Sequence, residues 1–241
     1  MSVEFDYDNA ILAFIDILGY KELINNKEPE DIYNYIYDAL DRKHKVAIDL
    51  DHPAQPYADA IKVQVLSDSL IMFIDATSLG TTGCGFLPHL CEFCLRFIGD
   101  TGLLLRGGIA TGNYFQKQLT NPKNQFIFSK ALVEAYKLER AANYPRIVLS
   151  EELLALGKVF RDYTAIDFDG VKFLDIYKDS KKYPVSYKRE LYMNIHSSLN
   201  KGSIQDKKIL AKQFYFKQYH NKRVREIAKQ EMDEFIFSFE S

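Results

Sequence analysis

Residues 9–23, NAILAFIDILGYKEL, begin with a run in which seven of the eight residues from Ala10 to Ile17 are apolar. A short apolar run ended by a glycine is typical of a buried strand, and Gly19 ends this one. The exception in the run is Asp16. A carboxylate in a buried strand is costly unless it is paired or has a chemical role. The stretch therefore predicts a central strand and makes Asp16 the first candidate for a functional residue.

The length and charge of the chain narrow the classes of protein to consider. With 241 residues, it can form one substantial domain with its own core. A formal net charge of −2 argues against a surface that coats nucleic acid. There is no apolar run of about 18 residues, so we expect no transmembrane helix. The acidic start MSVEFDYDN lacks the basic region of a secretory signal, so we expect a cytoplasmic protein.

Three cysteines, Cys84, Cys91 and Cys94, form a small and odd-numbered set. Cys91 and Cys94 have the spacing of a zinc-binding pair, but no second ligand pair follows them. The surrounding sequence FLPHLCEFCLRFI has a helical pattern. We therefore expect buried, reduced thiols in a core helix rather than a zinc site or a disulfide, which fits a cytoplasmic location.

Hydrophobic patterns predict the order of the first elements. The predicted elements are a strand at 10–17, a helix from residue 30 onward, a hairpin of strands at 60–68 and 69–75, a helix at 86–98 and a strand at 102–112. This β-α-β-β-α-β order is the ferredoxin-like core of an α+β fold, an antiparallel sheet with helices on one face.

Further elements extend this core. The pattern predicts strands at 124–129 and 145–150, helices at 130–142 and 151–156, and a closing hairpin at 163–177. We expect Ser150 to be the N-cap of the second of these helices and Asp169-Gly170 to form the hairpin turn. Beyond Pro184 the chain is polar, aromatic and helical in pattern. We therefore expect a main domain at 1–180 and a helical extension at 181–241 packed on it.

The predicted topology brings a second carboxylate to Asp16. The first strand lies beside the hairpin, so its end neighbours the hairpin turn, where Asp68 is found. Two carboxylates there repel each other unless a cation lies between them, and Mg²⁺ or Mn²⁺ prefers such oxygen ligands. Two ions held in this way suit a displacement at phosphorus. For Asp16 alone, a helix N-cap or a buried salt bridge is the alternative.

The residues after Asp16 strengthen the phosphate interpretation. Leu18-Gly19-Tyr20 predicts a tight turn into a helix. Backbone N–H groups at such a turn can cradle a triphosphate.

Several motifs resemble those of the class III nucleotidyl cyclases. FIDILGY is similar to the F-x-D-I-x-G-F motif of that family, and VLSDSLIMF stands at its second metal aspartate. LLLRGGIATG resembles its L-R-x-G-I-x-x-G strand, and FSKALVEAYKLER, RIVLSEELL and VKFLDIY follow in the family's order. The resemblance covers residues 8–178. Within the family, the motif sequences look most like those of the bacterial pyrimidine cyclases of Pycsar antiphage systems. Those enzymes make cyclic UMP or cyclic CMP, to which a separate effector responds.

The resemblance implies a role for each motif. Asp16 and Asp68 would ligate two Mg²⁺ or Mn²⁺ ions, with the Ile17 carbonyl as a further ligand. Residues Ile17, Leu18, Gly19 and Tyr20 would cradle the β- and γ-phosphates. Arg106 would contact a phosphate or the subunit interface; the alternative is a strand arginine that pairs with an acid at the dimer surface.

The chain departs from the adenylyl and guanylyl cyclases at two groups of positions. Where they carry an asparagine and, four residues later, a transition-state arginine, this chain has Val133 and Lys137. Lysine can stabilise charge but lacks the two-pronged geometry of arginine. Gln64 and Phe126 stand where those cyclases carry the lysine and aspartate that recognise a purine base. An amide and an aromatic ring fit a different base, which would be stacked on the ring and recognised by neutral groups. Tyr57 is a weaker candidate for narrowing the pocket.

The resemblance also implies a homodimer, because the active sites of that family lie between two subunits. It predicts a uridylate or cytidylate cyclase that acts on UTP or CTP. The alternatives are a catalytically degenerate, nucleotide-binding signalling module, and a nucleic-acid-binding protein that uses the C-terminal segment. From Asp206 to Lys229 that segment has eight basic residues against two acidic ones, with aromatics among them. We favour an amphipathic helix pair whose aromatics pack on the domain and whose basic face is solvated.

Overall fold

The computed structural model describes residues 8–34, 36–37, 60–75, 83–118, 125–200 and 207–239. The strands are β1 (Asp8–Leu18), β2 (Lys62–Leu66), β3 (Ser69–Asp75), β4 (Leu104–Gln118), β5 (Gln125–Ser129), β6 (Ile147–Leu149), β7 (Thr164–Ile166) and β8 (Lys172–Leu174). The helices include α1 (Tyr20–Asn26), α3 (Gly83–Thr101), α4 (Lys130–Ala141), α5 (Glu151–Ala155), α6 (Lys158–Asp162), α7 (Val185–Asn200) and α8 (Lys207–Phe239). Residues 29–34 and 36–37 are also helical.

The strands form one sheet in the order β2-β3-β1-β4-β6-β8-β7, and β5 pairs with β4. β1 lies between β3 and β4 and is antiparallel to both. The predicted α+β class and the βαββαβ core are therefore confirmed. The closing hairpin is also confirmed, because β7 and β8 pair antiparallel and Gly170 adopts a positive φ of 78°. The short helix α6 was not predicted.

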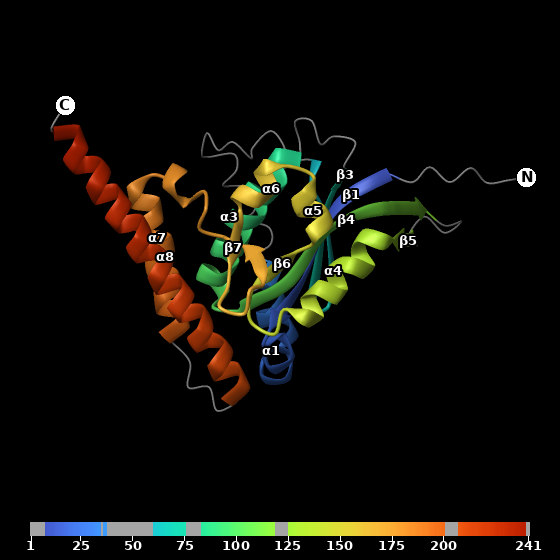
Figure 1. The fold of residues 1–241 in the computed structure, drawn as a ribbon. Coiled ribbons are helices and arrows are strands. Elements are labelled where there is room, and N and C mark those ends of the chain that lie inside the picture. The colour runs from blue at the N-terminus through green and yellow to red at the C-terminus, as the bar shows by residue number, and fades with distance from the viewer. Residues whose placement is uncertain are drawn as a thin grey trace, which may run out of the picture.

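Alternate residues of β1 face opposite sides of the sheet, as the strand period of two requires. Ile11, Ile15 and Ile17 belong to a large apolar cluster with the residues of α3. Ala10 and Leu12 belong to a second cluster with Ala131 and Ala135 of α4. Helices therefore cover both faces, with α3 and α4 on opposite sides (Figure 1). The expectation of helices on one face holds only for the first six elements, because α4 comes after them.

Glycines on β4 let α4 lie very close to the sheet. A Cβ atom at Gly108 would overlap the backbone carbonyl of Ala135, and one at Gly112 would lie 3.1 Å from the Ala131 nitrogen. The small side chains of Ala131 and Ala135, both buried, complete this contact. The close approach fixes α4, which begins at the N-cap Ser129, directly over the strands that carry the candidate site.

The interior of α3 agrees with the expectation for the cysteines. Cys91 and Cys94 are buried and free, and burial raises the pKa of both thiols. Such thiols are inert. The side chain of Cys84 lies outside the described residues. The N-cap prediction is also confirmed, because Ser150 Oγ accepts a hydrogen bond from the Leu153 amide at 3.1 Å.

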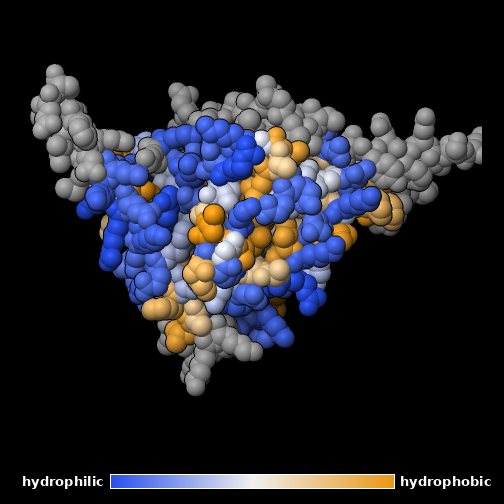
Figure 2. Space-filling model, viewed as in Figure 1, coloured by the Kyte–Doolittle hydropathy of each residue, from blue (hydrophilic) through white to orange (hydrophobic). Residues whose placement is uncertain are grey.

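The C-terminal helices pack on the same core. Leu191 and Ile195 of α7 lie against Gly99 of α3, and Phe216 and Ile227 of α8 are buried in the large cluster. Tyr215 stacks on Tyr144 with the ring centroids 4.6 Å apart. Phe214 is exposed, so not every aromatic of the segment packs inward. Much of the outer surface of α8 is hydrophilic (Figure 2). No helix within the described ranges is long and apolar enough to cross a membrane.

Candidate active site

The end of β1 meets the β2–β3 hairpin turn. Asp16 is the register partner of Ser69 on one side and of Arg106 on the other. The Ile17 amide donates a hydrogen bond to the Asp68 carbonyl at 2.8 Å, so the hairpin turn is fastened to the strand at this point. Ser67 in the turn has a positive φ of 55°, which lets the tight reversal form. The structure thus brings Asp16 and Asp68 to the same end of the sheet, as the topology predicted.

The Asp16 carboxylate is partly buried and lies near charged groups of both signs. Its side chain is 21% exposed. Burial raises the pKa of Asp16, and the nearby Asp68 carboxylate raises it further. The positive charges of Arg106 and Lys212 act in the opposite direction on this pKa. An acid of this kind gains from any additional positive charge close to it.

Arg106 connects Asp16 to α4. Its Nη2 donates to Asp16 Oδ2 at 3.0 Å, and its Nε donates to Glu139 Oε1 at 2.6 Å. Glu139 has a side chain only 5% exposed, and burial raises its pKa. Arg106 therefore pairs with acids inside its own chain, and the salt-bridge alternative for Asp16 is present in the structure. This arrangement is an Asp16–Arg106–Glu139 triad, which we call the acid–arginine triad.

The residues at this end suit a hard cation. Arg106 pairs with the carboxylates of Asp16 and Glu139, and Asp68 adds a third negative charge near Asp16. Arg106 and Lys212 supply two positive charges, and a divalent ion would offset the charge that remains. The carboxylate oxygens are the ligand type that Mg²⁺ and Mn²⁺ prefer. Within the described residues no group of three or more His, Cys, Asp or Glu side chains is arranged to hold a metal by itself. A metal here would need further ligands, such as phosphate oxygens and water.

The turn after β1 has the expected form. Gly19 has a φ of 89°, a conformation that favours glycine, and its carbonyl accepts the Leu23 amide in the first turn of α1. The Ile17 amide already donates to the Asp68 carbonyl, so it is not available to bind phosphate as the sequence predicted. Leu18 is a register partner of Leu104 in the β1–β4 ladder. Gly19 and Tyr20 are thus better placed than Ile17 and Leu18 to bind a phosphate.

The α4 candidates face away from the triad of their own chain. Ala131, Ala135 and Glu139 form the buried side of the helix. Val133 is 56% exposed, and Lys137 is 66% exposed with its Nζ 3.1 Å from Glu134 Oε2. The structure therefore does not bring Lys137 to Asp16 within one chain.

The base-reading candidates are also separated within one chain. Gln64 on β2 is the register partner of Ile71, whose side chain packs in the α4-side cluster. On β5, Ile127 faces that cluster, so Phe126 points to the opposite face and is 52% exposed. Tyr57 lies outside the described residues.

Two residues at the site were not predicted from the sequence. Glu139 was considered only as the end of the α4 motif, although its position four residues after Ala135 places it on the buried side of the helix. Lys212 was counted among the basic residues of the C-terminal segment, yet its charge acts on Asp16. No local signal distinguishes Lys212 from the other lysines of α8.

Solved structures identify the fold. The adenylyl cyclase CyaB from P. aeruginosa superimposes with a TM-score of 0.53 over 71% of this chain and 94% of that chain, at 17% identity. A bacterial light-regulated adenylyl cyclase gives 0.51 over 82% of this chain and 59% of that chain, at 12% identity. A class III adenylyl cyclase-like ATP-binding protein from Pseudomonas aeruginosa gives 0.51 over 73% and 40%, at 8% identity. No family model and no curated protein sequence matches the chain.

The chain therefore has the fold of a class III nucleotidyl cyclase domain. At these identities the similarity establishes the fold alone, and the activity has to be argued from the site.

Proposed function

We propose that this protein is a homodimeric nucleotidyl cyclase that depends on two Mg²⁺ or Mn²⁺ ions. The observation that carries the proposal is the meeting of Asp16 and Asp68 at one end of the sheet, beside the Gly19 turn. We further propose a pyrimidine nucleoside triphosphate as substrate, with UTP favoured over CTP by the motif resemblance alone. The product would serve as a second messenger for a separate effector in antiphage defence, in the cytoplasm.

The reaction is an in-line displacement at the α-phosphorus. The ribose 3′-oxygen forms a bond to phosphorus as its proton leaves, and the bond from phosphorus to the α,β-bridging oxygen breaks, so pyrophosphate departs with the electron pair. Bound divalent ions would neutralise the phosphates and acidify the hydroxyl. Asp16 and Asp68 would hold them, with the Ile17 carbonyl as a further ligand, and the Gly19–Tyr20 turn would bind the β- and γ-phosphates.

The acid–arginine triad has a part in this scheme. Asp16 would hold a divalent ion with the carboxylate that now accepts from Arg106, and the Arg106 guanidinium would then be able to donate to a phosphate oxygen. Glu139 keeps Arg106 at the site while this happens, because its contact with Arg106 does not involve Asp16. Arginine suits this role, since its planar donors match both carboxylate and phosphate.

Dimerisation is supported by the outward side of α4. Val133 and Tyr136 are exposed apolar residues there, and Lys137 projects from the same side. In a two-fold dimer of this kind, Lys137 of one chain would serve the site built on Asp16 of the other. Gln64 and Phe126 would then read the base, with Tyr57 as a further candidate.

One assay tests the proposal. Purified protein is incubated with Mn²⁺ and each of the four nucleoside triphosphates, and mass spectrometry is used to detect cyclic products and pyrophosphate. We expect a cyclic pyrimidine product that Asp16→Ala abolishes. The absence of product from all four triphosphates, together with unchanged nucleotide binding by Asp16→Ala, would rule out the metal site.

A nucleotide-binding signalling module without catalysis is the second candidate. It is favoured by Val133 and Lys137, which replace the asparagine and arginine of the adenylyl and guanylyl cyclases, and one protein with this fold is described as ATP-binding and cyclase-like. Metal-dependent nucleotide binding with no product from any triphosphate supports this candidate. Salt-dependent binding of RNA or DNA would instead support a nucleic-acid-binding role for the C-terminal segment.

A further inference from the structure

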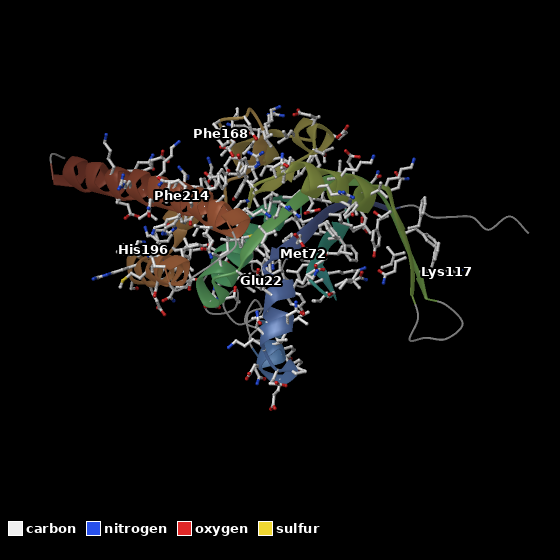
Figure 3. All side chains as sticks on the ribbon, turned by 90° about the horizontal axis from the view of Figure 1, so that it is seen from below. Glu22, Met72, Lys117, Phe168, His196 and Phe214 are labelled. Atoms are coloured by element: carbon white, nitrogen blue, oxygen red, sulfur yellow. The ribbon has the colours of Figure 1, made fainter. Side chains whose placement is uncertain are left out.

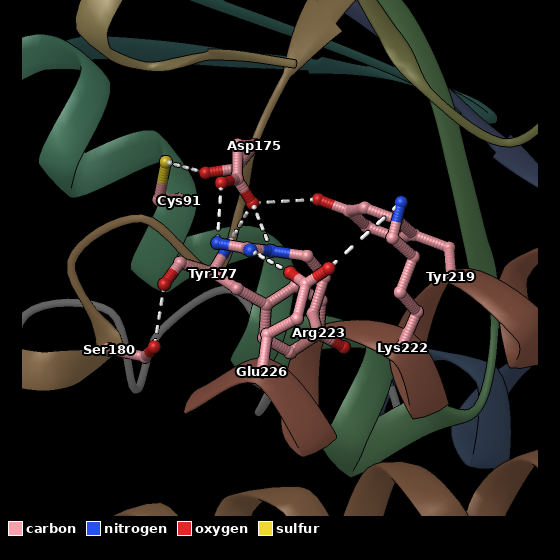
Figure 4. A network of polar contacts seen from close by, with 8 residues as sticks. All are labelled: Cys91, Asp175, Tyr177, Ser180, Tyr219, Lys222, Arg223 and Glu226. Atoms are coloured by element: carbon pink, nitrogen blue, oxygen red, sulfur yellow. Dashed lines mark hydrogen bonds and ion pairs between the residues drawn. The ribbon is translucent and has the colours of Figure 1, made fainter. Parts of the chain in front are cut away.

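The helix α8 is held in a fixed position by a polar network on its inner side. Arg223 Nη2 donates to Asp175 Oδ2 at 2.7 Å, and the Tyr219 hydroxyl donates to Asp175 Oδ1 at 2.8 Å (Figure 4). The Tyr177 hydroxyl shares a hydrogen bond with His220 Nδ1 at 2.6 Å. Asp175 directly follows β8 in the chain, so these contacts tie the middle of α8 to the sheet.

The N-terminal part of α8 consequently lies at the end of the sheet where β1 ends. A pocket of about 330 Å³ is lined there by Leu18 and Gly19, by Glu22 of α1, and by Lys212 and Gln213 of α8. Seen from below, the end of α8 reaches the side of α1 near Glu22 (Figure 3). The C-terminal helix thus forms one wall of a pocket whose opposite wall is the turn after Asp16.

Lys212 is the positive group that α8 adds to this pocket. Its side chain is half-buried, and its charge acts on the Asp16 carboxylate, whose pKa it lowers. Lys217 and Lys222, further along the same helix, have other partners: Lys217 bonds Asn200 at 2.6 Å, and Lys222 lies 4.0 Å from Glu226. The placement of Lys212 is therefore specific to its position on α8 and does not follow from the general basic character of the helix.

We propose that Lys212 binds the terminal phosphates of the nucleoside triphosphate, and the pyrophosphate formed from them, in the same chain that supplies Asp16. The proposal rests on the proposed function, because it takes the Gly19 turn as the phosphate subsite. An ammonium group on a flexible stem is a compact charge that can follow the phosphates from substrate to product. The C-terminal extension is then part of the active site rather than only a cover for the sheet.

Binding of inorganic tripolyphosphate with Mn²⁺, measured by calorimetry on the full chain, tests this without any turnover. We expect Lys212→Ala to weaken binding about tenfold, the loss of one charge-assisted contact, and Lys212→Arg to recover most of it. Lys222→Ala is the matched control on the same helix and should bind as the wild type does. Thermal unfolding of each variant shows whether the fold is retained. Wild-type affinity in Lys212→Ala overturns the proposal, as does an absence of tripolyphosphate binding by the wild-type protein.

Turnover separates this proposal from the proposed function. With an active protein, Lys212→Ala should raise KM by a similar factor, about tenfold, for every triphosphate that is turned over, since the contact is to phosphates and not to the base. A change in base preference instead would overturn the assignment. If no triphosphate is cyclised but tripolyphosphate binding still depends on Lys212, the proposed cyclase activity fails and the phosphate-binding role of Lys212 stands.

Discussion

Arg106 on β4 and Asp16 on β1 are register partners whose side chains meet, with Arg106 Nη2 donating to Asp16 Oδ2 at 3.0 Å. The strand next to β1 thus brings the cation that compensates the partly buried Asp16 carboxylate. A metal ion on Asp16 would use the same carboxylate oxygens, so the ion pair and a metal compete for one group. Glu139 would keep Arg106 at the site in that case, because its contact with Arg106 Nε does not involve Asp16.

Removal of the Arg106 guanidinium should reveal the free-energy cost of burying the Glu139 carboxylate. We expect Arg106→Met to lower the free energy of unfolding by about 2–4 kcal/mol, because an acid with little solvent exposure loses its partner. The double variant with Glu139→Gln should recover part of this loss. Urea unfolding measures both. Lys172→Met, which breaks the exposed pair with Glu151, is the control and should cost less than about 0.5 kcal/mol. Equal stability of Arg106→Met and the wild type would contradict the triad.

Two inactive variants should complement each other if the sites lie between chains. Asp16→Ala and Lys137→Ala remove groups that the proposed dimer takes from different subunits. A mixed dimer keeps one intact site, so random exchange should restore about a quarter of wild-type activity. The control is a mixture of Asp16→Ala and Asp68→Ala, which damage the same half of each site and should restore nothing. Recovery in the control, or none in the test mixture, would refute shared sites.

Base preference should follow Gln64 and Phe126. We expect the double variant Gln64→Lys with Phe126→Asp to shift the ratio of cyclic purine to cyclic pyrimidine product by about tenfold or more towards purines, since a charged pair then replaces the neutral groups. Mass spectrometry of products from an equimolar mixture of triphosphates measures the ratio. Phe128→Asp, at another exposed position of β5, is the control. An unchanged ratio in the double variant would remove these residues from the base site.

The close approach of α4 to β4 predicts a steric effect. Gly108→Ala should destabilise the protein by about 3 kcal/mol or more, because the new methyl group overlaps the carbonyl of Ala135. Gly157→Ala meets nothing within 4 Å and should change stability by less than about 0.5 kcal/mol. Thermal unfolding compares the two. A stable Gly108→Ala protein would mean that α4 lies farther from the sheet than described.

His220 should make stability depend on pH. Burial lowers the pKa of His220 to about 4, so the folded state favours the neutral ring. In the unfolded chain the His220 ring has a pKa of about 6.5, so as the pH falls the unfolded state takes up a proton before the folded state does. The stabilising contribution of the neutral His220 is therefore complete above about pH 6.5 and is lost as the pH falls towards 4. We expect about 2 kcal/mol less stability from this group at pH 5 than at pH 7.5. The pH dependence of urea unfolding should be weaker by that amount in His220→Gln.

Much of the fold was accessible from the sequence because its signals are local. The apolar run of β1, the polar break before β3, the Ser150 cap and the Asp169-Gly170 turn each lie within a few residues of the feature they specify. The meeting of Asp16 and Asp68 followed from the βαββαβ order, since register then determines which strand ends are neighbours.

The rest depends on contacts between distant segments. Lys212 lies near Asp16 because tertiary contacts, among them those of Arg223 and Tyr219 with Asp175, set the path of α8, and no periodicity in the basic segment reveals that path. Glu139 was missed for a related reason. Its burial depends on how closely the glycines of β4 let α4 approach, which is a property of two elements together.

The length of α8 has a mechanical consequence. Its 33 residues span about 50 Å, and the end opposite Lys212 projects away from the sheet (Figure 1). The Asp175–Arg223 contact lies between the two ends and ties the middle of the helix to the sheet. A regulatory domain fused beyond Phe239 would be joined to a continuous helix whose other end lines the proposed phosphate pocket. The C-terminal end of α8 is therefore a suitable attachment point for engineering a ligand-controlled variant.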